Sequence, residues 1–129
     1  MGLQLQVKTF KPAAASTTSV AAAQTLGSAG NLTLASAAST GAYAGTNVGS
    51  TISLTSTGNI SARTFTVTGT DASGSTITED ITGPNNNTVT GSVFFSTVTQ
   101  IAVDGAVGTN TSAGNGADTV GAIFTGATR

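Results

Sequence analysis

Residues 64–82, TFTVTGTDASGSTITEDIT, decide the fold because two alternating runs flank a short polar turn. Phe65 and Val67 alternate with threonines in the first run, and Ile77 and Ile81 alternate with polar residues in the second. Alternation with a period of two is typical of strands that bury one face. The stretch therefore predicts a β-hairpin.

The register of this hairpin follows from the numbering of its apolar residues. They all have odd numbers, so they share one face only if the loop between the strands has an odd length. Ala72-Ser73-Gly74 supplies a three-residue loop with glycine at the left-handed position, and Asp71 is expected to cap the turn. The predicted pairs are Phe65 with Ile81, Val67 with Glu79 and Gly69 with Ile77.

This register puts the Glu79 carboxylate on the apolar side of the hairpin. Two explanations stay open: Glu79 lies at a sheet edge, where an inward charge discourages aggregation, or it pairs with Arg63 on the same face. Pro84 cannot donate to a strand ladder, so the second strand should end at the Gly83-Pro84-Asn85 sequence.

The rest of the chain also favours short strands separated by Gly, Asn and Ser. Threonine, valine and isoleucine are branched at Cβ and pack well on a pleated surface. The expected strands are Asn31–Ala35, Thr51–Thr55, Arg63–Thr70, Ser75–Thr82, Ser92–Phe95, Thr97–Val103 and Thr119–Thr125. Residues 36–49, 85–87 and 108–116 are expected to be loops. The fold class that follows is all-β, an antiparallel β-sandwich or barrel-like domain.

The N-terminal residues have a different composition and pattern from the rest of the chain. Leu3, Leu5 and Val7 alternate with polar residues, and an Ala/Ser/Thr-rich stretch follows Pro12. We interpret residues 1–25 as an extended N-terminal arm with little core of its own, and residues 26–129 as a single β domain. A disordered tail is the alternative for the arm.

Charge is scarce, with four basic residues against five acidic ones and only 7% charged residues, compared with about 25% in ordinary domains. A nucleic-acid-binding surface needs a basic stripe, which this chain lacks. Neither a signal peptide nor an apolar run long enough to span a membrane is present, so we expect no membrane association. Low charge also favours association into an assembly.

The residue types needed for catalysis are largely missing. The chain has no His and no Cys, so neither the commonest general base nor a thiol nucleophile is available. We therefore expect no enzyme activity, no cofactor and no metal. A calcium site is a minor alternative, because loop residues offer oxygen ligands. They are Asp71, Asp104, Asp118 and the Asn85–Asn87 cluster.

The stretch from Thr64 to Gly74, followed by Ile77 to Asn85, resembles a stretch in small virion proteins of tailed bacteriophages. Residues 23–26, 30–34 and 95–99 look similar to flanking parts of those proteins, so that the resemblance covers about residues 23–103. It implies a head-associated structural role, most simply capsid decoration or cement on the outer surface of the virion. The implied partners are the major capsid protein and further copies of the chain.

In that role, the arm would add its apolar strand to an exposed sheet edge of a capsid protein or of a sister copy. The interface residues that we predict are Leu3, Leu5, Val7, Phe10, Tyr43 and Phe94. One alternative is a receptor- or glycan-binding module of a tail fibre or adhesin, with Tyr43, Phe94 and Phe95 as candidate contacts. Another is a tail or connector subunit that forms rings.

Overall fold

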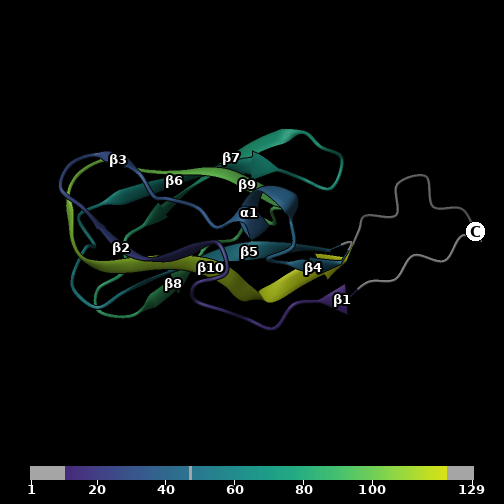
Figure 1. Cartoon of the computed structure of the whole chain (residues 1–129), viewed down its shortest axis with the longest axis horizontal. Coiled ribbons are helices and arrows are strands. Elements are labelled where there is room, and N and C mark those ends of the chain that lie inside the picture. The colour runs from purple at the N-terminus through teal and green to yellow at the C-terminus, as the bar shows by residue number, and fades with distance from the viewer. Residues whose placement is uncertain (1–10, 47, 122–129) are drawn as a thin grey trace, which may run out of the picture.

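A computed structural model describes residues 11–46 and 48–121 as two four-stranded antiparallel sheets with one short helix. The two sheets lie one above the other and enclose the core between them (Figure 1). The predicted all-β sandwich is thus confirmed. Within the described residues the sheets stay separate and do not close into the barrel-like alternative.

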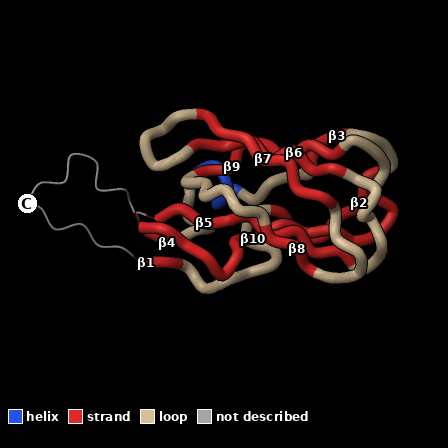
Figure 2. Tube along the Cα trace, turned by 180° about the vertical axis from the view of Figure 1, so that it is seen from behind, coloured by secondary structure: helices blue, strands red, loops and turns tan. Residues whose placement is uncertain are grey.

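The strands occur in a different order in space than along the chain (Figure 2). The first sheet has the order β2 (Ala21–Leu26), β10 (Val107–Gly121), β5 (Val48–Ser56) and β8 (Thr88–Thr90). The second has the order β3 (Gly30–Asn31), β9 (Thr97–Val103), β6 (Thr64–Thr70) and β7 (Thr76–Thr82). A small third sheet pairs β1 (Lys11–Pro12) with β4 (Gly45–Thr46), and α1 spans Ser36–Thr40.

The core is built from alternate residues of the central strands. Each of these strands turns one side inward, so the buried apolar residues come from both sheets. The largest fully buried aliphatic and aromatic side chains outside proline are Ile52 and Leu54 of β5, Phe65 and Val67 of β6, Val98 and Ile101 of β9, Val107 of β10, and Val20 and Phe95.

The predicted hairpin is confirmed residue by residue as β6 and β7. The pairs are those expected from parity, with Phe65 opposite Ile81, Val67 opposite Glu79 and Gly69 opposite Ile77. Gly74 has φ +87°, the left-handed conformation that the three-residue loop requires. Asp71 Oδ1 accepts hydrogen bonds from the backbone N–H of Ser73 (2.9 Å) and Ser75 (3.0 Å), as a turn cap should.

Several other predicted strands need correction. Thr97–Val103 is a strand as predicted, whereas β5 extends beyond Thr51–Thr55 at both ends. Only Asn31 of the predicted strand Asn31–Ala35 lies in β3. The segment Ser92–Phe95 is irregular and makes a single bridge, from Phe95 to Ser50. Of Thr119–Thr125, residues 119–121 belong to β10 and the others lie outside the described residues.

The prediction of a loop at residues 108–116 was wrong, because this segment is part of β10. Its glycines and small polar residues look like a loop in the sequence. In the fold, β10 pairs with β2 on one side and with β5 on the other, which satisfies its backbone groups. Small residues are needed there, since a Cβ on Gly114 would collide with the carbonyl of Ser16.

The boundary that we placed at residue 25 falls inside β2. Val20 and Ala21 are fully buried, so this part of the predicted arm contributes to the core rather than lacking one. Residues 36–49, expected to be a loop, contain α1, β4 and the start of β5.

The first and last described residues lie at the same end of the sandwich (Figure 1). Lys11 pairs with Thr46, and Gly121 pairs with Val48, so both flank the junction between β4 and β5.

Candidate interaction surface

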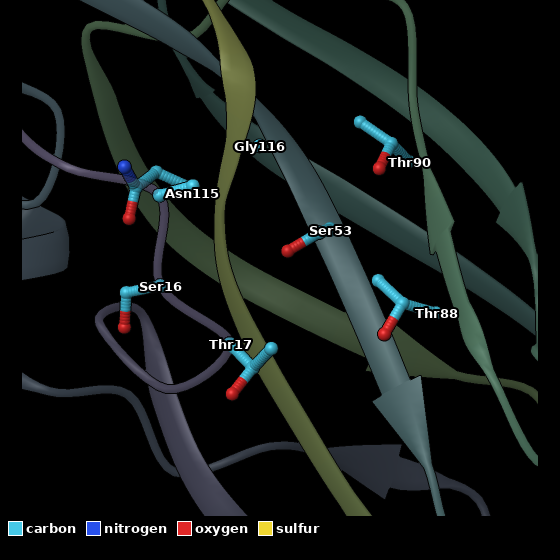
Figure 3. Close-up of a pocket in the computed structure, with 8 residues that line it drawn as sticks. Ser16, Thr17, Ser53, Thr88, Thr90, Asn115 and Gly116 are labelled. Carbon is cyan, nitrogen blue, oxygen red and sulfur yellow. The ribbon is translucent and has the colours of Figure 1, made fainter.

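An open groove of about 470 Å³ lies on the outer face of the first sheet (Figure 3). Hydroxyl groups line it from three directions: Ser16 and Thr17 from the N-terminal segment, Ser53 from β5, and Thr88 and Thr90 from β8. Ala15, Asn115 and Gly116 complete the lining, so no residue with a charged side chain takes part. Such a groove can donate and accept hydrogen bonds but has no group suited to acid–base chemistry.

Asn115 fixes the N-terminal wall of this groove. Its side chain is almost completely buried, with 1% exposed. Asn115 Nδ2 donates to the Ala14 carbonyl at 2.9 Å, and Oδ1 accepts from Ser19 Oγ at 2.6 Å. Backbone bonds from Ser16 N to Asn115 O (3.3 Å) and from Val20 N to Ala113 O (3.0 Å) extend the contact. The segment from residue 14 to residue 20 is therefore held against β10.

A second groove, of about 300 Å³, lies where the two sheets open between their edge strands β7 and β8. We call it the seam groove. Its lining consists of residues 79–82 and 89–92. Ile81 is buried on its β7 side, and Val89 is half-buried on its β8 side. Unlike the hydroxyl-lined groove, the seam groove has an apolar part and two carboxylates.

Glu79 lies at the edge of the second sheet, as one of the two explanations predicted. Its Oε1 accepts hydrogen bonds from Ser92 N at 2.6 Å and from Ser92 Oγ at 3.1 Å, and Val93 N also donates to the carboxylate. The alternative pairing with Arg63 is not formed, because Arg63 Nε donates to the Ala106 carbonyl at 3.0 Å. Glu79 thus anchors the segment that leads from β8 to Phe95.

Tyr43 and Phe94, the predicted aromatic interface residues that the structure describes, have different environments. Tyr43 is buried, with 2% exposed, and its hydroxyl donates to the Phe95 carbonyl. Burial raises the pKa of Tyr43 above its ordinary value. The surface position expected for Tyr43 is therefore wrong: in this structure the ring packs within the domain.

Phe94 is the large apolar residue that the described surface exposes, at 37%, while Phe95 is fully buried. These two neighbours thus lie on opposite sides of the boundary of the core. Among the predicted aromatic contacts that the structure describes, Phe94 is the one exposed to meet a partner. Leu3, Leu5, Val7 and Phe10 lie outside the described residues.

The oxygen ligands considered for calcium serve local structure where they are described. Hydrogen bonds from the Ser73 hydroxyl and from the Ser75 backbone hold the pKa of Asp71 below its ordinary value. Asp104 Oδ1 accepts from Thr64 N at 3.1 Å. Across residues 11–46 and 48–121, no group of three or more acidic side chains is placed to hold a metal ion.

The hydroxyl-lined groove is the feature that sequence reasoning missed. Serine and threonine are so abundant in this chain that no pattern singles out the ones that meet in space. Asn115 is an amide side chain within a run of small residues, but Asn110 in the same run looks identical, so the sequence does not single it out.

Comparison of the chain with protein-family models, with curated proteins and with solved structures finds no match. In the part of the chain that the structure describes, no helix is both long enough and apolar enough to cross a membrane. The functional argument therefore rests on the surface features themselves.

Proposed function

We propose that this chain is a structural protein of a bacteriophage virion, which binds the outer surface of the head and bridges capsid subunits. Its support from the sequence is the resemblance of residues 23–103 to small virion proteins of tailed phages. In this role the chain carries no catalytic site, and its partners are the major capsid protein and further copies of itself.

The observation that carries the proposal is the uncharged, hydroxyl-lined groove on the outer face of the first sheet. It is broad, open and set on paired strands, so it offers a rigid polar surface rather than an enclosed ligand site. Many copies that each bury a modest polar interface of this kind would together resist the internal pressure of packaged DNA. Binding of this kind depends on shape and hydrogen bonds, and little on salt.

The direct test is to mix purified protein with heads assembled without it and to measure co-sedimentation and stoichiometry. The proposal predicts saturable binding at a copy number that matches the capsid lattice. Heads that bind no protein, or bind it without saturation, contradict it and favour a tail or ring subunit.

Thr88→Lys tests whether the groove is the contact surface. Thr88 is exposed on β8, and a lysine there puts a long charged side chain into the groove. We expect at least a tenfold loss of affinity for heads, corresponding to about 1.4 kcal/mol. Thr99→Lys is the matched control, because Thr99 is exposed on β9 of the other sheet and should leave binding unchanged. Equal effects of the two variants would rule out the groove.

A receptor- or glycan-binding module is the second candidate, favoured by the hydroxyl and amide groups that converge on the same groove. Sugar sites usually also offer an aromatic platform, and none of the eight lining residues is aromatic. A glycan-binding screen separates the candidates, since a specific hit that Thr88→Lys abolishes would favour the module.

A further inference from the structure

The outer edge of β7 is open for pairing with another strand. Gly83 N donates to Arg63 O at 2.8 Å and Asp71 N donates to Ser75 O at 2.9 Å, so odd-numbered residues direct their backbone groups toward β6. The N–H and C=O groups of Thr76, Thr78, Asp80 and Thr82 therefore point away from β6. Among the described residues, no strand pairs with β7 on that side.

The side chains beside this edge would accommodate an added strand with one apolar face. Ile81 is buried at the rim of the seam groove, while Ile77, Val89 and Val93 are half-buried against the core. A strand that pairs with the edge of β7 would place its inward side chains over these residues. Burial of that apolar strip would add to the hydrogen bonds of the ladder.

The charge of the edge argues against pairing of β7 with β7 of another copy. Glu79 and Asp80 are adjacent on the strand, and neither β7 nor β8 contains a basic residue. Pairing of two such edges brings four carboxylates together, which is unfavourable. The edge instead favours a strand that is neutral or positively charged.

We propose that residues 3–9 of a second copy of this chain pair with the open edge of β7. This segment reads Leu-Gln-Leu-Gln-Val-Lys-Thr, so it has one apolar face and carries Lys8 on the other. When the apolar residues face inward, they lie over the strip along the seam groove, and Lys8 lies on the same face as Asp80. The inference is independent of capsid decoration.

The place where the described chain begins favours a second copy as the donor of this segment. Thr9 and Lys11 are two residues apart, so they lie within about 7 Å of each other. Lys11 pairs with Thr46 of β4, and both views place β1 at the lower margin of the molecule and β7 at the upper one, with the β6–β7 turn at the same end as β1 (Figures 1 and 2). Pairing of residues 3–9 along the whole of β7 would require Thr9 to lie beside that strand as well as close to β1, whereas donation of the segment to a neighbouring copy meets no such limit.

Two full-length variants test the pairing, one by changing the β7 edge and the other by changing the donated segment. Thr78→Pro removes an N–H that points away from β6, so it blocks the edge without removing a β6–β7 hydrogen bond. Leu5→Asp places a carboxylate in the seam groove beside Glu79. Thr78→Ala and Leu5→Val are the matched controls, because they keep the edge donor and the apolar face. Asp80→Pro is a second edge variant with the same backbone geometry as Thr78→Pro.

Sedimentation velocity and light scattering over a range of concentrations give the mass of each species. We expect the wild-type chain and both controls to associate, and each blocking variant to have the mass of a single chain. An equimolar mixture of the two blocking variants should regain a two-chain complex, because one still has an intact arm and the other an intact edge. That recovery also shows that the Leu5→Asp variant keeps a folded β7 edge.

Three results would overturn the inference. The first is a wild-type chain that stays a single chain up to its highest soluble concentration. The second is association of Leu5→Asp like the wild type while Thr78→Pro does not associate, which indicates pairing of β7 with β7. The third is a variant mixture that contains single chains only. None of these results bears on head binding, so the two proposals fail separately.

Discussion

Among individual side chains, Asn115 joins two parts of the chain that are far apart in sequence. The hydrogen bonds of its side-chain amide with Ala14 and Ser19 hold the N-terminal segment over β10. They thereby shape one wall of the hydroxyl-lined groove. A buried amide with both ends satisfied gives a specific position to a segment that has few apolar residues of its own.

Asn115→Ala should therefore lower the free energy of unfolding by about 1–2 kcal/mol, since the Ala14 carbonyl and the Ser19 hydroxyl lose their partner. Asn110→Ala is the control, because Asn110 lies on the same strand but is exposed, and it should change stability by less than about 0.5 kcal/mol. Denaturant-induced unfolding measures both. Equal values for the two variants would show that the Asn115 bonds do not stabilise the fold.

Asp71 makes one part of the stability depend on pH. Its hydrogen bonds with Ser73 and Ser75 lower its pKa in the folded state, so the ionised carboxylate stabilises the turn. This contribution is complete above the ordinary pKa of 3.8 and is lost as the pH falls through the lowered value. Asp71→Asn removes the titration. The stability difference between wild type and variant should therefore shrink as the pH is lowered from 6 toward 2, as measured by thermal unfolding.

At the scale of elements, the β6–β9 pairing contains a break in register between Thr68 and Gly69. At this point a Cβ on Gly69 would overlap the Thr97 carbonyl and come within 2.9 Å of the Phe95 ring. Glycine is thus needed because the neighbouring backbone approaches closely, and no left-handed conformation is involved.

Gly69→Ala should destabilise the protein by about 2 kcal/mol, because the methyl group forces β9 or Phe95 to move. Gly108→Ala is the matched control within β10, since a Cβ there meets nothing within 4 Å. We expect the control to be neutral or slightly stabilising. Thermal unfolding of the two variants measures both effects. A Gly69→Ala variant as stable as the wild type would contradict the close approach of β9 and Phe95 to Gly69.

Whether the sequence alone predicted a strand depended on the kind of side chains that the strand carries. The β6–β7 hairpin was predictable to its register because branched and aromatic residues alternate with polar ones and Gly74 marks the turn. β10 was not predictable, since its Gly, Asn and Ala residues carry little strand preference. What makes β10 a strand is pairing on both sides, which depends on segments distant in sequence.

The same limit applies to the candidate surfaces. Alternation along β7 predicted that Glu79 lies on the apolar face, and the structure selects the sheet edge among the two explanations left open. The exposure of Phe94 is found in an irregular segment, where strand alternation does not apply. The burial of Tyr43 did not follow from alternation either, because it depends on how residues 36–49 fold back over Phe95. The hydroxyl-lined groove combines residues from four segments, namely the N-terminal segment, β5, β8 and β10, which only the tertiary fold brings together.

At the scale of the whole molecule, the N-terminal part of the chain comprises residues 1–10, which we propose to pair with a neighbour, and residues 11–20, which lead into the core at Val20. Deletion of residues 1–10 removes none of the contacts of the described domain, so cooperative unfolding should persist. Deletion of residues 1–20 removes the fully buried Val20 and its bond to Ala113, and should abolish cooperative unfolding. Circular dichroism during heating compares the two, at concentrations too low for association. A cooperative transition in the longer deletion would contradict this division.

The sheet order has a consequence for the time course of folding. The second sheet can form once β9 has been made, because β3, β6 and β7 all precede it along the chain. The first sheet cannot, since β10 lies between β2 and β5 and is synthesised after every other described strand. On the ribosome, the sheet that contains β6, β7 and β9 would therefore lack a complete opposing sheet until β10 emerges. That interval is when the nascent chain is most exposed to aggregation.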